Sequence, residues 1–362
     1  MNTSVETVIV GGGQAGLATA HHLLRQGREC LVLEANQRVG DGWRQQWDSL
    51  RLYSPAKFDG LPGMPFPASA WHFPTKDETA DFLEAYATQL GLPVRLGTRV
   101  LHVAADDGGF RVDTDEGTFD ADNVVVATGT FGRTPYVPDF AAGLDPATTQ
   151  LHSSQYRRPA QLPEGRVLVV GASHSGQDIA LELARERQVV LAGRDCGEIP
   201  VPLESRRMRA LFPLIWFIWG RVLNRGTPIG RKELRKIRLH GGPALRVKRA
   251  DLRAAGVERT TERVVGVHDG RPVLGDDRVL EVSTVIWATG FRQQFDWIEP
   301  DVVGEEGWPR EERGEVAEVP GLFFCGLSFQ SSFRSMLLGG VGEDAAHVAR
   351  RITERASLSV RA

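Results

Sequence analysis

Two stretches of the chain repeat one pattern, in which an apolar run is followed by a glycine turn and then by apolar positions at helical spacing. The first begins with the β-branched run 5–10, which predicts a central parallel strand covered on both faces. The helix predicted after it ends at Gly27. The second has the apolar run 167–170, a helix predicted over 177–186 and a strand predicted over 189–192. This repetition predicts two dinucleotide-binding units of α/β type.

Each glycine of the first turn has a separate predicted role. Gly11 permits the turn, Gly13 lets the backbone approach a pyrophosphate, and Gly16 lets the helix pack closely against the strand. Glu34 ends the next predicted strand, 18 residues beyond Gly16. An acid at about that distance accepts hydrogen bonds from the ribose hydroxyls of an adenosine. A glycine turn with an incidental acid is the alternative.

The second unit keeps Gly171 and Gly176 but has Ser173 in place of the middle glycine. Arg194 stands 18 residues beyond Gly176, where the first unit has its acid. An acid suits a free 2′-hydroxyl, whereas a guanidinium suits a 2′-phosphate. We therefore expect FAD or NAD in the first unit and NADPH in the second. A simple surface ion pair between Arg194 and Asp195 is the alternative.

Other elements follow from the same patterns. The segment 38–63 is rich in glycine, tryptophan and proline, which favours a loop along a planar ring system, with an aromatic-rich surface loop as the alternative. Thr75 is expected to cap a helix that runs through Leu90. The sequence Ala-Thr-Gly follows an apolar strand twice, at 127–129 and at 288–290. Further strands are expected at 94–103, 110–114, 118–126, 264–267, 282–287 and 322–326, and a helix to Ile352 after the glycine-rich turn 338–342.

The segment 131–165, dominated by proline and glycine, is interpreted as the crossing into a second domain. The predicted organisation is an FAD-binding domain over 1–157, an NADPH-binding domain over 158–288 and a return of the FAD-binding domain over 289–362. The NADPH-binding domain then carries a helical insertion at about 200–255.

This insertion contains the apolar, aromatic run 211–219, followed by basic residues to 238. The run is shorter than the roughly 18 residues that cross a bilayer. One interpretation places it in a membrane interface, where tryptophan and basic side chains favour the headgroups. The other is a helical hairpin packed on its own domain, on a partner subunit or over the substrate entrance.

Composition narrows the class of protein. Hydrophobic content of 41% and charged content of 25% are typical of a globular protein, and a net charge of −3 does not favour nucleic-acid binding. The three cysteines stand far apart, which suits a reducing cytosol and argues against a cysteine-pair reductase. The first strand follows Met1 almost directly, so we expect no signal peptide and a cytoplasmic location. No metal-ligand spacing is present, and we expect no metal.

Taken together, the motifs resemble those of the class B flavin-dependent monooxygenases, the group of the flavin-containing, Baeyer–Villiger and plant indole-pyruvate monooxygenases. The resemblance is closest to compact bacterial flavin-containing members and covers nearly the whole chain outside about 200–255. The linker signature of the group survives in part, with His152 and Tyr156 at its spacing and one extra residue between Phe140 and Gly143.

The resemblance implies a glutathione-reductase-like flavoprotein, with an NADPH domain inserted in an FAD domain, that binds FAD and NADPH. The cofactor-binding residues that it implies are Gly11, Gly13, Gln14, Ala15, Gly16, Glu34, Gly42, Trp43, Val100, Thr128, Gly129, His152, Gly171, Ser173, Ser175, Gly176, Arg194, Thr289, Gly290, Gly326 and Leu338.

The chain departs from the group at one position that bears on the chemistry of the flavin. Many members place an asparagine beside the flavin, in the segment that matches 50–55, where it helps to stabilise the oxygenated flavin. Here Tyr53 and Ser54 stand instead, and they are the candidate catalytic residues. Tyr53 either offers its hydroxyl in place of the amide or walls the pocket.

The activity implied is that of an NADPH-dependent monooxygenase, which forms a C4a-(hydro)peroxyflavin and oxygenates a sulfide, an amine or a ketone with O2. An NADPH-dependent flavin reductase or oxidase, which releases hydrogen peroxide or passes electrons to a carrier, is the first alternative. A dinucleotide-gated regulatory or membrane-associated module that uses 211–238 is the second. A small-molecule substrate is expected in either enzyme, and the sequence leaves a homodimer open.

Overall fold

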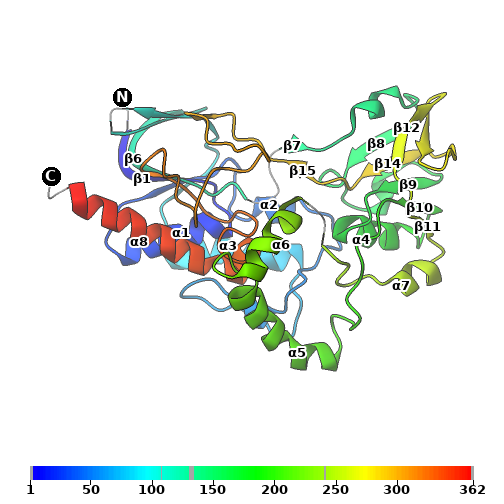
Figure 1. Ribbon diagram of the computed structural model, residues 1–362, viewed down its shortest axis with the longest axis horizontal. Coiled ribbons are helices and arrows are strands. Elements are labelled where there is room, and N and C mark those ends of the chain that lie inside the picture. The colour runs from blue at the N-terminus through cyan, green and yellow to red at the C-terminus, as the bar shows by residue number, and fades with distance from the viewer. Residues whose placement is uncertain (1–2, 107, 130–133, 240–241, 360–362) are drawn as a thin grey trace.

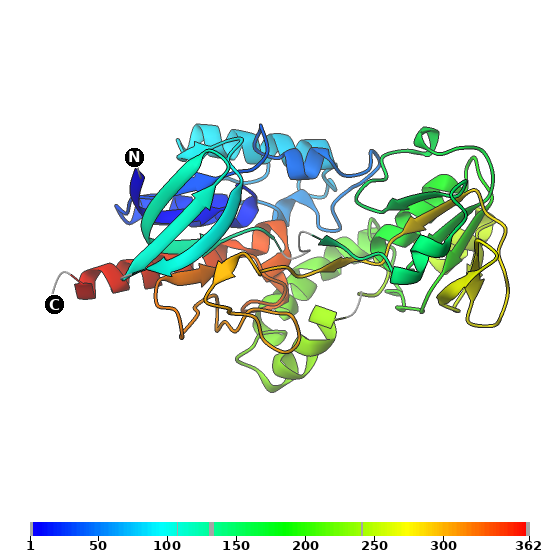
Figure 2. The same ribbon diagram turned by 90° about the horizontal axis from the view of Figure 1, so that it is seen from above.

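The chain folds into two lobes, each built on its own sheet (Figure 1). The computed structural model describes residues 3–106, 108–129, 134–239 and 242–359. Seen from above, extended segments join the lobes (Figure 2). One of these joins contains β7 (Thr134–Pro135) and β15 (Phe291–Arg292), which pair with each other in antiparallel fashion.

The first lobe holds an eight-stranded sheet with β1 (Thr3–Val10) near its centre. This strand pairs in parallel with β2 (Leu31–Leu33) on one side and β6 (Gly117–Val126) on the other. Its residues 7–10 are buried, as predicted for a strand covered on both faces. The other strands are β3 (Val94–Arg95), β4 (Val100–Asp106), β5 (Gly109–Thr114), β16 (Ile298–Glu299) and β17 (Leu322–Phe324).

The single strand predicted over 94–103 is wrong. The chain forms β3 and β4 instead, and these lie on opposite sides of β1 in the strand order. Gly97 separates them with a φ of +64°, a conformation that ends an extended run and that glycine adopts without strain. After Gly97 the chain crosses to the other side of the sheet, where β4 runs in the same direction as β3.

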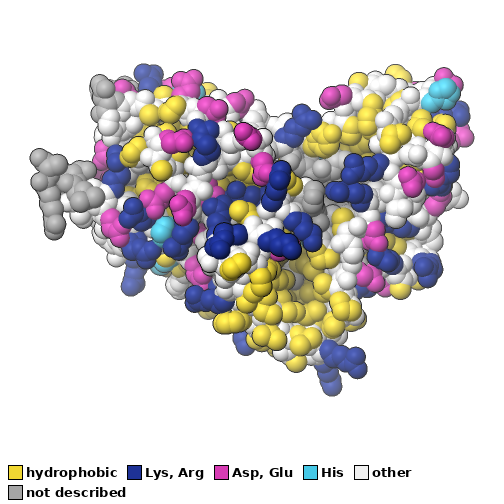
Figure 3. Space-filling model, viewed as in Figure 1, with side chains coloured by type: hydrophobic (Ala, Val, Ile, Leu, Met, Phe, Trp, Pro, Cys, Tyr) yellow, Lys and Arg dark blue, Asp and Glu magenta, His cyan; other side chains and the backbone are white. Residues whose placement is uncertain are grey.

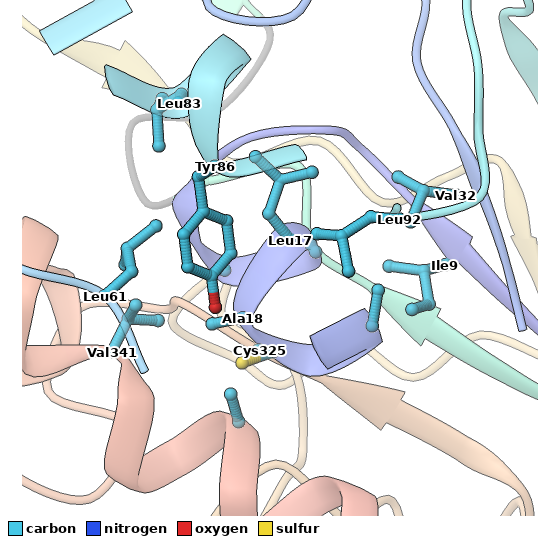
Figure 4. Close-up of a cluster of buried hydrophobic side chains, with 14 of the residues drawn as sticks. Ile9, Leu17, Ala18, Val32, Leu61, Leu83, Tyr86, Leu92, Cys325 and Val341 are labelled. Atoms are coloured by element: carbon cyan, nitrogen blue, oxygen red, sulfur yellow. The ribbon is translucent and has the colours of Figure 1, made fainter. Parts of the chain in front are cut away.

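Three helices cover one face of this sheet: α1 (Gln14–Arg25), α3 (Lys76–Gln89) and α8 (Gly342–Ser359). Figure 4 shows their core, where the Tyr86 ring of α3 lies among Leu17, Leu61 and Val341. The Tyr86 hydroxyl donates to the Pro62 carbonyl at 2.7 Å, which satisfies the polar end of a buried ring. As predicted, Thr75 caps α3, with Glu78 completing a capping box.

The second lobe holds a sheet of five parallel strands in the order β11-β10-β9-β14-β8. Its helix α4 (His174–Leu183) begins three residues before the predicted 177, because the glycine turn leads directly into it. The first strand, β8, lies ahead of the predicted boundary between residues 157 and 158. The strands are β8 (Thr149–His152), β9 (Val167–Val170), β10 (Val189–Ala192), β11 (Glu258–Thr260) and β14 (Thr284–Trp287), with the hairpin β12 (Val264–His268) and β13 (Arg271–Leu274) and the helix α7 (Arg249–Ala254) beside them.

The remaining elements are short, apart from those of the insertion. The loop 38–63 contains α2 (Asp41–Arg44) and η1 (Ala56–Phe58), and the linker contains η2 (Asp139–Gly143) and η3 (Pro159–Gln161). Before α8 lie η5 (Phe333–Met336) and η6 (Leu338–Gly340). The insertion consists of α5 (Arg206–Phe217), the π-helical η4 (Ile218–Val222) and α6 (Pro228–Leu239).

The insertion is anchored to the first lobe by a buried ion-pair cluster. The Glu311 carboxylate, fully buried, pairs with Arg225 at 2.5 Å and with Arg238 at 2.8 Å. Its second oxygen accepts from the Gly314 amide at 2.8 Å, so every charge in the cluster has partners. The insertion is thus a helical hairpin packed on the same chain, but on the first lobe and not on the NADPH-binding domain that was expected to carry it. No helix within the described ranges is long and apolar enough to cross a membrane.

Candidate functional site

The first glycine turn is held by contacts that allow no side chain. A Cβ on Gly11 would lie 2.6 Å from the Ala127 carbonyl oxygen, and one on Gly16 would lie 1.9 Å from the Gly11 carbonyl oxygen. A Cβ on Gly13 would meet no protein atom within 4 Å. Packing therefore requires Gly11 and Gly16, whereas Gly13 leaves open space above the turn.

That open space lies at the N-terminus of α1. Gly13 caps the helix without a side-chain hydrogen bond, and the first turn of the helix has no acidic residue. The first amide groups of a helix have no partners within it and attract negative charge. The turn, with Gln14 and Ala15 after it, therefore fits the pyrophosphate of a dinucleotide.

Glu34 stands beside this turn at the end of β2. Its Oε2 accepts from the Gly12 amide at 2.7 Å, and its Oε1 accepts from the Asn36 amide at 2.8 Å. The Thr98 amide donates to the Glu34 carbonyl oxygen at 2.9 Å, which brings the start of β4 and the buried Val100 to the same place. The carboxylate is thus oriented by backbone groups, as a ribose ligand needs to be.

The other predicted flavin-side residues lie around the same end of the sheet. Thr128 follows β6 and its Cα lies 3.4 Å from the position of a Gly11 Cβ. Gly326, with a φ of +88°, faces the Ala15 side chain so closely that its own Cβ would lie 2.6 Å away. Gly42, like Gly129, has open space where a side chain would stand. Trp43 packs against the cores of both lobes, and Leu338 is buried in the core cluster that includes residues of α1 and α8.

The second glycine turn repeats the steric pattern of the first. A Cβ on Gly171 would lie 2.2 Å from the Ala288 carbonyl oxygen, and one on Gly176 would lie 1.8 Å from the Gly171 carbonyl oxygen. The two Ala-Thr-Gly turns therefore occupy equivalent positions, since each one lies against the first glycine of its unit. The two units therefore present similar helix N-termini. Like α1, α4 has no acidic residue in its first turn.

The second turn differs in being covered by the chain itself. Ser173 Oγ donates to the Gly242 carbonyl oxygen at 3.3 Å, and His174 Nε2 lies 2.7 Å from the Pro243 carbonyl oxygen. Ser175 follows on the first turn of α4 and is half-buried. Nothing in the local sequence around Ser173 indicates this cover, because Gly242 lies about seventy residues further along the chain.

Arg194 has no ion pair with any residue that the structure describes, and its side chain is exposed. Asp195, the partner weighed as an alternative, pairs with Arg249 instead. Sequence reasoning missed a second guanidinium nearby, that of Arg259 on β11, which donates to the Gly193 carbonyl oxygen at 2.7 Å. Arg194 is therefore available for an anionic ligand at the end of β10.

Tyr53 joins the two lobes. Its hydroxyl donates to Asp178 Oδ2 on α4 at 2.7 Å, and its ring lies 4.9 Å from the His174 ring. The Arg246 guanidinium lies 5.0 Å from the centre of the Tyr53 ring and donates to the Leu52 carbonyl oxygen at 2.6 Å. Burial raises the pKa of both Tyr53 and Asp178. The phenol is a neutral donor that already has an acceptor.

His152 and Tyr156 tie the linker to the second lobe. His152 Nε2 lies 2.9 Å from the Gly290 carbonyl oxygen, and the Tyr156 hydroxyl donates to Glu182 on α4 at 2.8 Å. Burial lowers the pKa of His152, so its ring is neutral. Thr289 donates its hydroxyl to the Tyr136 carbonyl oxygen. His152 of the linker signature thus contacts the second Ala-Thr-Gly turn, whereas Tyr156 is bound to α4.

Ser54, the second candidate catalytic residue, donates to Asp59 Oδ1 at 2.5 Å. Asp59 is completely buried, and its Oδ2 has no hydrogen-bond partner among the described residues. Burial raises the pKa of the Asp59 carboxyl to about 7. A Cβ on Gly339 would lie 3.1 Å from the Asp59 Cα, so this acid lies against the glycine-rich turn that precedes α8.

Replacing Asp59 by asparagine should stabilise the protein at alkaline pH. The wild-type carboxyl has a pKa of about 7 in the folded protein, above its ordinary value, so stability falls as the pH rises from about 4 to about 7. Asp59→Asn keeps the acceptor for Ser54 and removes this loss. We expect a gain on the order of 4 kcal/mol at pH 8 and none at pH 4, measured by urea unfolding. Asp122→Asn, at an exposed position, is the control, and an unchanged stability of Asp59→Asn at pH 8 would contradict the burial of a charge there.

Comparison with known proteins agrees with this geometry. The pyridine nucleotide-disulphide oxidoreductase family matches residues 8–199. An uncharacterised CzcO-like oxidoreductase of Geobacillus kaustophilus is 36% identical, over 96% of this chain and 98% of the relative. The indole-3-pyruvate monooxygenase YUCCA1 of Oryza sativa is 31% identical, over 95% of this chain and 90% of the relative. A flavin-containing monooxygenase from Stenotrophomonas maltophilia superposes with a TM-score of 0.76, at 27% identity over 98% of this chain and 99% of that one.

The family model ends before the insertion, but the matches to the two relatives and to the solved structure extend over both lobes and include it, where the sequence motifs alone did not reach. The predicted fold, two dinucleotide-binding domains of a flavoprotein, is confirmed. The chain therefore belongs to the pyridine nucleotide-disulphide oxidoreductase family and, within it, to the class B flavin monooxygenases, enzymes that use FAD and NADPH.

Proposed function

We propose that this enzyme uses NADPH and O2 to oxygenate a small organic substrate, either a sulfide or amine or a ketone. The observation that carries the proposal is the opposite charge at equivalent places in the two lobes. Glu34 at the end of β2 is oriented by backbone amides, and Arg194 at the end of β10 is free of ion pairs with described residues. This contrast supports a resident FAD in the first lobe and NADPH in the second.

The chain contributes binding, orientation and exclusion of water. The cofactors, when bound, supply hydride transfer and the activation of O2. The Gly13 turn is open where a pyrophosphate would approach the N-terminus of α1, whereas at the Ser173 turn Gly242 and Pro243 border the approach to α4. Trp43, packed against the core of the first lobe, and the buried Leu338 supply apolar surface, which would help to exclude water from a bound flavin.

The position of Tyr53 favours the oxidase alternative. Its hydroxyl donates to Asp178 and so is not free to replace the asparagine that other members place beside the flavin. A thiol relay has less support, because burial raises the pKa of both Cys30 and Cys325 to about 12 and all three cysteines are unpaired. The competition is therefore between oxygen transfer to a substrate and release of hydrogen peroxide.

Counting products per NADPH consumed separates these functions. The flavin-loaded enzyme is incubated with NADPH and air, with and without a panel of sulfides, amines and ketones, and oxygenated product and hydrogen peroxide are both measured. A substrate that turns peroxide release into product formation supports the monooxygenase. Peroxide alone with every compound supports the oxidase, and the absence of NADPH consumption would contradict both.

Arg194→Ala should abolish most of the preference for NADPH over NADH. A charge-assisted contact to a phosphate contributes about 1.5–3 kcal/mol, so we expect the ratio of kcat/KM values to fall roughly 10- to 100-fold, almost wholly through the KM for NADPH. The flavin reduction rate with saturating NADH serves as the internal reference. Arg253→Ala, another exposed arginine of the second lobe, is the control and should leave the ratio unchanged. An unaltered ratio in Arg194→Ala would mean that another cation, such as Arg259, binds the 2′-phosphate.

A further inference from the structure

The helix α5 carries apolar side chains on two opposite faces. Met208 and Phe212 face inward and are buried in a cluster with Phe73. Leu214 and Phe217, each 57% exposed, stand on the other side of the helix. A helix that packs against one neighbour needs a single apolar stripe, so the outward stripe has no role in the folding of this chain.

The outward stripe is part of a larger patch. Leu211, at 42% exposure, extends it along α5, and Ile229, at 56%, is a further exposed apolar side chain at the start of α6. Figure 3 shows hydrophobic side chains gathered over this end of the molecule, with basic side chains at its edge. Contiguous apolar patches of this kind mark interaction sites more often than isolated exposed residues do.

The surroundings of the patch are strongly basic, although the whole chain has a net charge of −3. Residues 206–239 include ten arginines and lysines and a single acid, Glu233. Four of the ten have ion-pair partners: Arg225, Arg238, Arg235 and Lys236. The other six are exposed and form no ion pair with a described residue: Arg206, Arg207, Arg209, Arg221, Arg231 and Lys232.

We propose that the outward face of α5, with the start of α6, docks on an anionic lipid surface. Apolar side chains enter the boundary between headgroups and acyl chains, while unpaired arginines meet the negative headgroups around them. Arg207 and Arg221 stand near the two ends of the stripe, which suits a helix lying parallel to the surface. A second copy of the chain is disfavoured as the occupant, because a two-fold contact would bring the unpaired arginines of both copies together.

Vesicle sedimentation tests this proposal with the full-length holoenzyme. We expect binding to mixed phosphatidylcholine–phosphatidylglycerol vesicles at least roughly 10-fold tighter than to phosphatidylcholine alone, and weaker binding as salt is added. The double variant Leu214→Glu/Phe217→Glu should bind the mixed vesicles at least roughly 10-fold more weakly than wild type. The triple variant Arg206→Gln/Arg207→Gln/Arg209→Gln should lose most of the preference for the anionic lipid.

Leu101→Glu and Val265→Glu, at 53% and 58% exposure elsewhere on the molecule, are the matched controls and should bind as wild type does. Flavin content and melting temperature report whether each variant is folded. Binding that is absent in wild type, or equal in wild type and the double variant, would overturn the proposal. So would a wild-type dimer that the double variant dissociates, since a second copy would then cover this face.

Discussion

Gly13→Ala should fold as the wild type does and bind flavin more weakly, whereas Gly16→Ala should also be destabilised. The two substitutions add the same methyl group three residues apart. The Gly13 Cβ would enter open space at the N-terminus of α1, and its φ of −81° is one that alanine adopts freely. The Gly16 Cβ would lie 1.9 Å from the Gly11 carbonyl oxygen. The first change therefore blocks only a ligand, and the second forces the backbone to move.

Flavin content and unfolding measured on the same samples check this pair. For Gly13→Ala we expect an unchanged melting temperature of the apoprotein and a Kd for FAD at least about 10-fold higher. For Gly16→Ala we expect a loss of about 1–3 kcal/mol or more in stability, together with loss of flavin. Ser173→Ala, at the equivalent position of the second lobe, should retain full flavin content. Tight FAD binding by Gly13→Ala would place the pyrophosphate somewhere other than this turn.

Glu311→Gln should destabilise the protein far more than Glu306→Gln, although each removes one carboxylate that is paired with arginine. Glu311 is fully buried between Arg225 and Arg238, so its neutralisation leaves buried positive charge without compensation. The expected cost is about 3–5 kcal/mol in the free energy of unfolding. Glu306 pairs with Arg235 at 2.6 Å at the surface, where water screens the charge, and about 0–1 kcal/mol is expected.

Urea unfolding followed by tryptophan fluorescence measures both variants, and the signal is informative because the Arg238 guanidinium lies 4.6 Å from the centre of the Trp308 ring. Equal midpoints for the two variants would mean that the insertion is held to the first lobe by its apolar contacts alone.

Local sterics explain what was predictable from the sequence. Gly11 and Gly16 are required by atoms of their own strand–turn–helix unit and of one neighbouring strand. Because these contacts are local, the spacing of the glycines in the sequence is enough to predict the turn. The capping of α3 by Thr75 and Glu78 is likewise a contact over three residues. The fold class and the two cofactor sites follow from such short-range rules.

Contacts between distant segments could not be predicted in this way. Tyr53 meets Asp178 across 125 residues of sequence, and Arg225 meets Glu311 across 86. Both pairs join residue types that are common on protein surfaces, and nothing in the local pattern at either residue indicates burial. For the same reason the sequence left open whether Tyr53 offers its hydroxyl to the flavin or walls the pocket, whereas in the structure the hydroxyl donates to Asp178 on the helix of the other lobe.

The anchoring of α5 and α6 has a consequence for chimeric enzymes. The chain leaves the second lobe after β10, packs residues 206–239 against the first lobe, and returns to the second lobe at α7. The sequence of the second lobe is thus interrupted by a segment whose contacts are with the first lobe. A chimera that takes the second lobe from a relative should therefore take the segments before and after the insertion but keep this chain's own residues 206–239. Glu311 stays in the first lobe, and its arginine partners must stay with it.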